Sequence, residues 1–195
     1  MKRLARGTRC YLRHPSRGDG RELVALNQAS RKLHRGFISP PVTPAQYRAY
    51  LRRVGEEANE GLLVCRHDDD AIVGVVNLSQ IFRGPLKSAY MGYYVGEPFA
   101  ALGHLTEGVG LALRHAFGRL RLHRVEANIQ PDNEASRRVA MRNGFRLEGY
   151  SPRYLKVSGR WRDHERWTAL ADTRPGDPTH PASLARPARG PRRAV

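Results

Sequence analysis

The sequence predicts an α/β fold built on a mixed, mostly antiparallel sheet that is flanked by helices. Short apolar segments of strand length alternate along the chain with longer segments of helical spacing. Their order includes a single strand–helix–strand crossover, which joins two strands that run parallel. The chain has 195 residues, of which 40% are hydrophobic and 27% charged, and this composition fits one globular domain.

The first half of the chain contains the elements of the antiparallel part of the sheet. Thr43 and Pro44 mark a helix start, because a hydroxyl residue suits the N-cap, proline suits the first helical position, and Gln46 lies three residues after the cap. We expect that helix to run to about Ala58. The other elements expected before residue 81 are a strand at Thr8–Arg13, a helix at Arg21–Leu33, and strands at Gly61–His67 and Ala71–Gln80 around an Asp-Asp-Asp turn.

The second half contains the crossover and a closing pair of strands. Asn133 suits the N-cap of the helix that follows it, and Gly144 is placed to end that helix. The expected strands are Ser88–Val95, Arg124–Gln130, Phe145–Val157 and Arg160–Ala171, the last two joined by a turn at Ser158-Gly159. The expected helices are Gly103–Leu120 and Asn133–Arg142.

Charge is the unusual global property of the chain. Lys and Arg number 34 against 18 Asp and Glu, so the net charge is +16, which attracts polyanions such as RNA. Seven cations lie in residues 1–21 and five in residues 174–195, where repeated prolines exclude a helix or an inner strand. We therefore expect one domain over residues 1–172 and a flexible basic tail over residues 173–195, with ribosome or RNA contact through the basic ends.

Cysteine usage and hydropathy indicate a cytoplasmic protein without a membrane partner. Cys10 and Cys65 form no CxxC motif, which fits idle thiols in a reducing compartment. No apolar run approaches ~18 residues, and the charged start has no apolar core behind it. Trp161 and Trp167 are assigned to packing. No metal site is expected, because metal-ligand spacing is absent among His104, His115, His123 and His164.

The strand that ends at Val95 leads into a loop of mostly small residues, 98–104, and then into a helix. Unpaired backbone N–H groups and the helix dipole at such a junction suit a pyrophosphate. The sequence by itself therefore indicates an anion site before the helix that begins near Gly103.

Four strings in the second half resemble a known family. They are Arg124-Val125-Glu126-Ala127, Pro131-Asp132-Asn133-Glu134-Ala135-Ser136, Asn143-Gly144-Phe145 and Glu148-Gly149-Tyr150. They look like the later motifs of the GNAT superfamily of acetyl-CoA-dependent N-acetyltransferases, and more narrowly like the ribosomal-protein-alanine N-acetyltransferases of the RimJ type. The similarity spans roughly Gly61 to Leu170. It implies the GNAT fold, whose sheet is splayed between its fourth and fifth strands.

The resemblance implies acetyl-CoA as cosubstrate and a set of residues that bind it. Pantetheine would lie in the splay and the pyrophosphate on the loop before the helix, although Ala100 and Ala101 depart from the residues that the family usually has there. Ala101 matters because alanine does not reach a positive φ as cheaply as glycine. The implied cofactor-binding residues are Tyr93, Tyr94, Val95, Leu102, Gly103, His104, Leu105, Thr106, Asn133 and Arg138.

An amine must be neutral before it attacks a thioester. At pH 7 a Lys side chain with a pKa near ~10.4 lies about 4.6 kcal/mol from its neutral form, whereas an α-amine near ~7.8 lies about 1 kcal/mol away. An α-amine thus demands little of a general base. Relatives protonate the leaving thiolate with a tyrosine, whose place is Ala140 here, or with a serine, which is Ser136. Glu126 and Asp163 are the candidate bases, and the alternatives are helix capping for Ser136 and a surface pair with an arginine for Glu126.

The sequence leaves two classes of function open. The first is direct acetyl transfer to a protein N-terminal α-amine, as on a ribosomal protein, with a small-molecule amine such as an antibiotic or a polyamine as the alternative acceptor. The second is a non-enzymatic RNA- or ribosome-binding module that keeps the fold with a degenerate phosphate loop. The departures at Ala100 and Ala101 and the basic ends favour the second class, and the full motif set favours the first.

Overall fold

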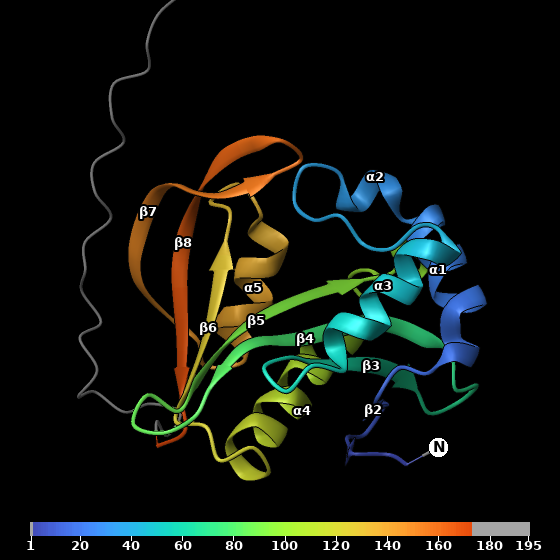
Figure 1. Ribbon diagram of the computed structural model, residues 1–195, viewed down its shortest axis with the longest axis horizontal. Coiled ribbons are helices and arrows are strands. Elements are labelled where there is room, and N and C mark those ends of the chain that lie inside the picture. The colour runs from blue at the N-terminus through green and yellow to red at the C-terminus, as the bar shows by residue number, and fades with distance from the viewer. Residues whose placement is uncertain (1, 173–195) are drawn as a thin grey trace, which may run out of the picture.

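The computed structural model describes residues 2–172. The predicted basic tail over residues 173–195 lies outside the described residues. Within them the chain forms one eight-stranded sheet with the strand order β1-β2-β3-β4-β5-β6-β8-β7 (Figure 1). The strands are β1 Ala5–Arg6, β2 Cys10–Arg13, β3 Glu60–Arg66, β4 Ile72–Phe82, β5 Ser88–Val95, β6 Arg124–Ile129, β7 Arg146–Val157 and β8 Arg160–Leu170.

The sheet is mixed and mostly antiparallel, as predicted. Neighbouring strands are antiparallel except for β5 and β6, which run parallel because α4 connects them in a crossover. The two-residue β1 was not expected from the sequence, so the predicted fourth and fifth strands are β5 and β6. These two strands separate after three paired positions, which confirms the predicted splay.

The helices are α1 Gly20–Ala29, α2 Arg31–His34, α3 Pro44–Val54, α4 His104–Gly118 and α5 Glu134–Arg142, with short 3-10 turns η1 Arg17–Asp19 and η2 Glu97–Phe99. The prediction of one continuous helix over Arg21–Leu33 was wrong. The hydroxyl of Ser30 donates to the Leu26 carbonyl at 2.7 Å and accepts from the Glu97 N–H at 2.8 Å, and the helix breaks at this residue.

The helix that starts at Pro44 also ends earlier than expected, at Val54 instead of Ala58. The N–H of Gly55 donates to both the Leu51 and Arg52 carbonyls, and the N–H of Glu56 then donates to the Arg53 carbonyl at 3.3 Å. This change to bonds of the i to i−3 type tightens the last turn and ends the helix.

The predicted caps and turns are confirmed. The hydroxyl of Thr43 accepts from the Gln46 N–H at 3.2 Å, and the Asn133 side-chain oxygen accepts from the Ser136 N–H at 3.1 Å. Gly144 lies beyond α5 with a φ of 78°. Ser158 and Gly159 both have positive φ, 48° and 80°, as the tight turn of the β7–β8 hairpin requires.

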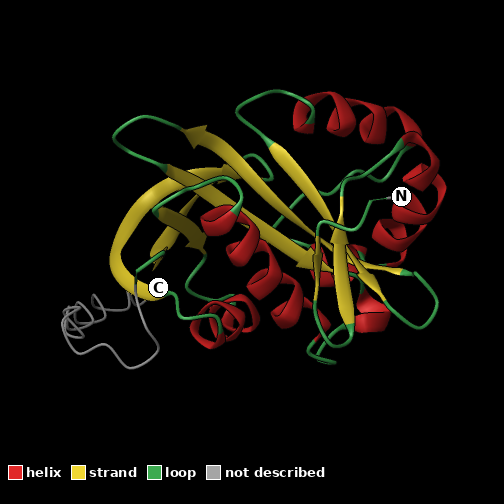
Figure 2. Ribbon diagram, turned by 90° about the horizontal axis from the view of Figure 1, so that it is seen from below, coloured by secondary structure: helices red, strands yellow, loops and turns green. Residues whose placement is uncertain are grey.

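Helices cover both faces of the sheet (Figure 2). Because side chains alternate along a strand, Leu62 and Val64 of β3 belong to the core that contains α4, and Leu63 and Cys65 belong to the core with α1 and α3. The helix α4 packs closely, since a Cβ at Gly108 would lie 2.6 Å from a Val64 methyl group. None of the described helices combines the length and apolarity that a membrane span requires.

The two tryptophans differ in environment. Trp167 is 5% exposed, and its packing role is confirmed, whereas Trp161 is 61% exposed, so the prediction that it packs in the interior was wrong. Trp161 lies next to the turn of the β7–β8 hairpin and is paired across it with Lys156. Nothing in the local sequence distinguishes it from an inward-facing strand residue. Cys10 and Cys65 are both buried and unpaired.

Candidate active site

A wedge opens between β5 and β6. The strands are paired from Ser88–Arg124 to Tyr90–Glu126 and then part, so that β5 continues to Val95 without β6 as a neighbour (Figure 1). A cavity of about 480 Å³ lies along this open side of β5 and extends to the starts of α4 and α5. Two of its walls therefore come from the two halves of the crossover, as the sequence predicted.

The turn before α4 closes one end of the cavity with backbone. Ala101 and Gly103 have φ values of 60° and 80°, and α4 starts at the next residue, His104. The N–H groups of the first helical turn lack intrahelical partners, and the helix dipole adds positive potential, so this end suits an anion. Ala101 adopts the left-handed conformation despite its Cβ, at a cost of about 1–2 kcal/mol.

Eight of the ten residues expected to bind the cofactor line this cavity. They are Tyr93, Tyr94, Val95, Gly103, Leu105, Thr106, Asn133 and Arg138. The other two lie outside its lining. Leu102 is half exposed and its carbonyl accepts from the Arg9 guanidinium at 3.0 Å, and His104 is buried with its ring against Phe99.

Two arginines of α5 place positive charge at the cavity. Arg138 and Arg142 both line it, and Arg138 also pairs with Glu134 at 3.3 Å. Arg137, the neighbouring cation, points elsewhere and pairs with Glu165 of β8 at 3.0 Å. Only the first two can thus meet a phosphate in this cavity.

One wall of the cavity was not anticipated from the sequence. It is formed by Leu33, His34, Phe37 and Ile38, from α2 and the segment after it. The ring Nε2 of His34 donates to the Val95 carbonyl at 2.8 Å, so this group of β5 is already satisfied. The adjacent apolar pair Phe37-Ile38, in a stretch outside any predicted element, is the signal that indicates such a wall.

Ser136 lies in the cavity with its hydroxyl free. Its N–H is capped by Asn133, and its carbonyl accepts from the Tyr93 hydroxyl at 2.8 Å. Burial raises the pKa of Tyr93, so the phenol stays protonated and remains the donor. Within residues 2–172 the side-chain oxygen of Ser136 has no hydrogen-bond partner, and it is therefore available to a ligand.

The two candidate bases from the sequence are already engaged. Glu126 accepts from Arg124 Nε at 2.7 Å, the surface pairing that was its alternative reading. Asp163 accepts from the Tyr150 hydroxyl and from the Arg153 N–H at 2.7 Å, and these bonds lower its pKa. Neither carboxylate lines the wedge cavities.

His164 is the titratable residue that sequence reasoning missed. It is 3% exposed and lines a second cavity of about 90 Å³, together with Gly92, Asn133 and Ser136. Its Nδ1 donates to the Arg162 carbonyl at 3.0 Å, which leaves Nε2 as the basic nitrogen of the neutral ring. Burial lowers its pKa and thus favours this neutral form near pH 7.

Glu107, in the first turn of α4, has a structural role. Its carboxylate accepts from the N–H groups of Arg9 and Cys10 at 2.9 and 3.3 Å and pairs with Arg9 Nε at 3.2 Å. Burial raises the pKa of Glu107, but the bonds from Arg9 and Cys10 outweigh it, and the pKa lies below its ordinary value. The residue ties α4 to β2 beside the loop that closes the cavity.

Replacement of Glu107 by glutamine is expected to lower the free energy of unfolding by about 1–2 kcal/mol at pH 7, because hydrogen bonds to a charged acceptor contribute more than neutral ones. The folded pKa lies below the unfolded one, so this stabilisation is present above about pH 4.3 and is lost as the pH falls through the folded pKa. Urea unfolding of the wild type and of Glu107→Gln at pH 7 and at pH 3 measures this difference in the free energy of unfolding. The control is Glu134→Gln at an exposed first-turn acid of α5. Equal stability of wild type and Glu107→Gln at pH 7 would contradict the proposed stabilisation by the Glu107 carboxylate.

Comparison with known proteins places these features in a family. A profile described as "Acetyltransferase (GNAT) domain" matches residues 9–146. The chain belongs to the GNAT acetyltransferase family. It is an N-acetyltransferase, and acetyl-CoA is the cosubstrate of GNAT enzymes. The cavity fits this cosubstrate, with backbone donors for a pyrophosphate at one end and, along its side, the edge of β5 that β6 leaves open for the pantetheine amides.

Curated N-acetyltransferases share more than a third of the aligned residues with this chain. The chain is 38% identical over 128 residues to the "Probable N-acetyltransferase YjcK" of Bacillus subtilis, which is 66% of this chain and 69% of the relative. It is 37% identical over 97 residues to the ribosomal protein uS5 alanine N-acetyltransferase of Escherichia coli. That match covers 50% of each protein, so the chain spans about half the length of the E. coli enzyme.

Solved GNAT structures share the fold. Mycobacterium smegmatis RimJ, solved in complex with CoA-disulfide, has a TM-score of 0.76 and 27% identity, covering 83% of this chain and 82% of that one. A spermidine N-acetyltransferase of Vibrio cholerae has a TM-score of 0.70 and 22% identity, covering 85% and 95%. At that identity the second likeness shows the fold alone.

Proposed function

We propose that this GNAT enzyme acetylates the N-terminal α-amine of a protein, with ribosomal proteins as the first acceptors to test. The observation that carries the proposal is the wedge between β5 and β6, which joins a backbone anion site at one end to a free Ser136 hydroxyl inside. Its relatives include an enzyme named for acetylating alanine on ribosomal protein uS5. The unpaired cysteines fit activity in the cytoplasm.

When bound, acetyl-CoA supplies its acetyl group as a thioester. We propose that the turn at Leu102–Thr106 holds the pyrophosphate, that Arg138 assists it, and that β5 from Tyr93 to Val95 aligns the pantetheine. Ser136 Oγ donates its proton to the departing sulfur as the amine nitrogen replaces that sulfur on the acetyl carbon, and it regains a proton from the group that takes the proton of the amine. The backbone of Ser136 is held for this by Asn133 and Tyr93.

For the proton of the amine we propose His164 Nε2 as the acceptor, directly or through one water. His164 shares its cavity with Ser136, it is neutral, and its tautomer is held by the Arg162 carbonyl. Glu126 and Asp163 remain candidates through a water. Their existing bonds to Arg124, Tyr150 and Arg153 suit them better to holding neighbouring side chains in place.

Acetyl-CoA at 100 times its Kd is expected to stabilise the folded state by about 2.7 kcal/mol, because it binds only that state. For a chain of this size the melting temperature should rise by about 5–11 °C. A thiol-release assay with peptides that begin with alanine then tests transfer. Absence of both the thermal shift and thiol release would overturn the proposal.

The same assay separates the classes of acceptor. Spermidine is the matched small-molecule amine, and a surface with a net charge of +16 repels such a polycation. We expect peptides with a free α-amine to react and the same peptides with a blocked N-terminus to be inert. Turnover of spermidine without turnover of any peptide would retain acetyl transfer and reject the protein acceptor.

A further inference from the structure

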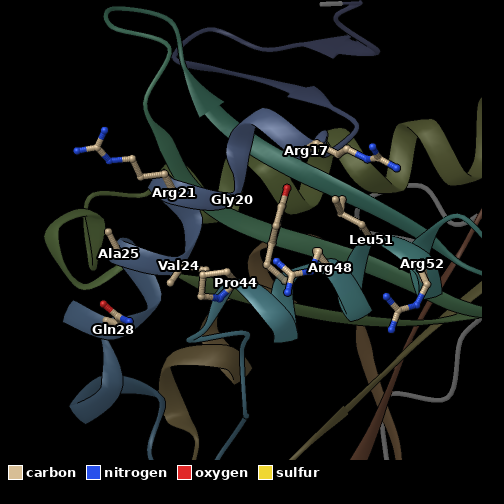
Figure 3. A pocket seen from close by; sticks show the side chains of 11 residues that line it. Arg17, Gly20, Arg21, Val24, Ala25, Gln28, Pro44, Arg48, Leu51 and Arg52 are labelled. Atoms are coloured by element: carbon tan, nitrogen blue, oxygen red, sulfur yellow. The ribbon is translucent and has the colours of Figure 1, made fainter.

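A third and larger hollow lies away from the two wedge cavities. It is a groove of about 1110 Å³ between α1 and α3, and none of its lining residues lines the two wedge cavities (Figure 3). The two helices have 10 and 11 residues, so the groove can follow them for about 15 Å. Acetyl transfer at the wedge leaves this surface without an assigned role.

The floor of the groove is apolar. Val24 of α1 and Tyr47 and Leu51 of α3 form it, and their spacing places them on the facing sides of the two helices. Pro44 and Ala25 extend this floor along the groove (Figure 3). A floor of this kind favours a partner with apolar side chains.

The rim of the groove is strongly cationic. Arg17, Arg21, Arg48 and Arg52 line it, and their side chains spread around the floor (Figure 3). Within residues 2–172 none of these guanidinium groups has a hydrogen bond or an ion pair to an acid. Four positive charges therefore border the groove without a paired acid among the described residues.

Two acids that neighbour these arginines in the sequence already have partners. Asp19 forms a buried pair with Arg13 at 2.7 Å, and the carboxylate of Glu22 accepts from the Ile72 N–H at 2.6 Å. Arg3 and Arg9 near the N-terminus are paired with Asp70 and Glu107. The four arginines of the groove differ from these two in having no acidic partner in the part of the chain that the structure describes.

We propose that this groove docks an acidic amphipathic helix of the acceptor protein, at a distance from the N-terminus that is acetylated. Apolar side chains of such a helix would cover the floor, and its carboxylates would pair with the four arginines. An RNA strand would pair its phosphates with the arginines, but it has no aliphatic side chains to pack on Val24 and Leu51, and Tyr47 is only 3% exposed and offers little ring surface for base stacking. Identifying the partner as the acceptor rests on the proposed function, whereas the binding itself does not.

Hydrogen bonds connect the groove to the segment that forms one wall of the wedge cavity. Gln28, which lines the groove, donates to the Val42 carbonyl at 2.8 Å, and its neighbour Asn27 donates to the Pro41 carbonyl at 2.9 Å. Both bonds hold the end of the segment that carries Phe37 and Ile38 into the wedge cavity. A docked helix would therefore lie next to the segment that borders the active site.

The binding experiment uses the full chain and a fluorescein-labelled peptide, LEELLEELLEEL, with its glutamine analogue LQQLLQQLLQQL as control. The variant Arg48→Glu/Arg52→Glu removes charge from the groove. Its matched control is Arg119→Glu/Arg121→Glu, an equal charge change at exposed arginines outside the groove. We expect the groove variant to weaken binding of the acidic peptide at least tenfold and the control variant to change it less than twofold, with both variants keeping the acetyl-CoA thermal shift.

Turnover gives the second readout. A peptide that begins with alanine is joined by a flexible linker to the acidic helix, and we expect its KM to be at least tenfold below that of the unlinked peptide, because docking raises its effective concentration. The groove variant should abolish this difference. Equal loss of peptide binding in both variants, or loss of binding to a single-stranded RNA but not to the peptide, would overturn the docking site. Absence of turnover with either peptide, while binding depends on the groove, would overturn only the proposed function.

Discussion

Replacement of Ser136 by alanine is expected to lower kcat for acetyl transfer about 100-fold or more, the usual effect of losing a positioned proton donor. The hydroxyl is the only group removed. The Ser136 N–H stays capped by Asn133 and its carbonyl stays bonded to Tyr93, because both bonds use the backbone. The affinity for acetyl-CoA, measured as the thermal shift, should therefore be unchanged while turnover falls.

The conservative variant Ser136→Thr tests whether the hydroxyl is what matters. It keeps an O–H donor at the same position and should recover much of the lost kcat. If Ser136→Ala retained wild-type turnover, Ser136 would be a capped helix residue without a part in the chemistry, which is the alternative that the sequence left open. Stability within about 0.5 kcal/mol of wild type is expected in either case.

Replacement of His164 by asparagine is expected to lower kcat/KM by about 100-fold at pH 7 and to change its pH dependence. In the wild type, log(kcat/KM) should rise with a slope of one per pH unit below the pKa of the acceptor α-amine, which is near ~7.8. Because burial lowers the pKa of His164, its protonation adds a second unit of slope only at lower pH. The asparagine variant should keep the part of the pH profile that the α-amine causes and lose the steeper part that His164 causes.

The charges around His164 affect the pH dependence of kcat/KM through the pKa of the ring. Asp132 from the turn before α5 and Asp163 on its own strand favour the protonated ring, whereas burial opposes it more strongly. The ring of Tyr154 on β7 lies 6.1 Å away, and the Arg162 carbonyl holds Nδ1. The matched variants are Asp163→Asn and Glu126→Gln. If one of these lost the steeper part of the pH profile while His164→Asn kept it, that carboxylate would be the base.

Much of the fold follows from local patterns. The caps at Thr43 and Asn133, the end of α5 at Gly144 and the turn at Ser158–Gly159 each depend on residues within a few positions, and each was predicted. The break of α1 at Ser30 was not predicted, because its hydroxyl is bonded to Glu97, a residue 67 positions away. Local propensity contains no information about such a partner.

The candidate site also has parts that the sequence predicted and parts that it did not. The wedge, the turn before α4 and the position of Ser136 in the cavity were anticipated, because they follow from a strand–loop–helix crossover with family motifs. The wall at Phe37 and Ile38 depends on the His34 bond to Val95, 61 residues along the chain. Likewise the sequence shows Glu126 and Asp163 as acids but not which partners they bond.

The sequence alone thus determined the order of the elements, the crossover that opens the sheet, the positive charge of the chain and the chemical class of the enzyme. The tertiary structure alone decided which polar groups of the described residues remain unpaired, among them His164 Nε2 in the wedge and the four arginines between α1 and α3. The reason is physical. Secondary structure depends mainly on neighbouring residues, whereas the ionisation and availability of a side chain depend on burial and on partners that only folding brings together.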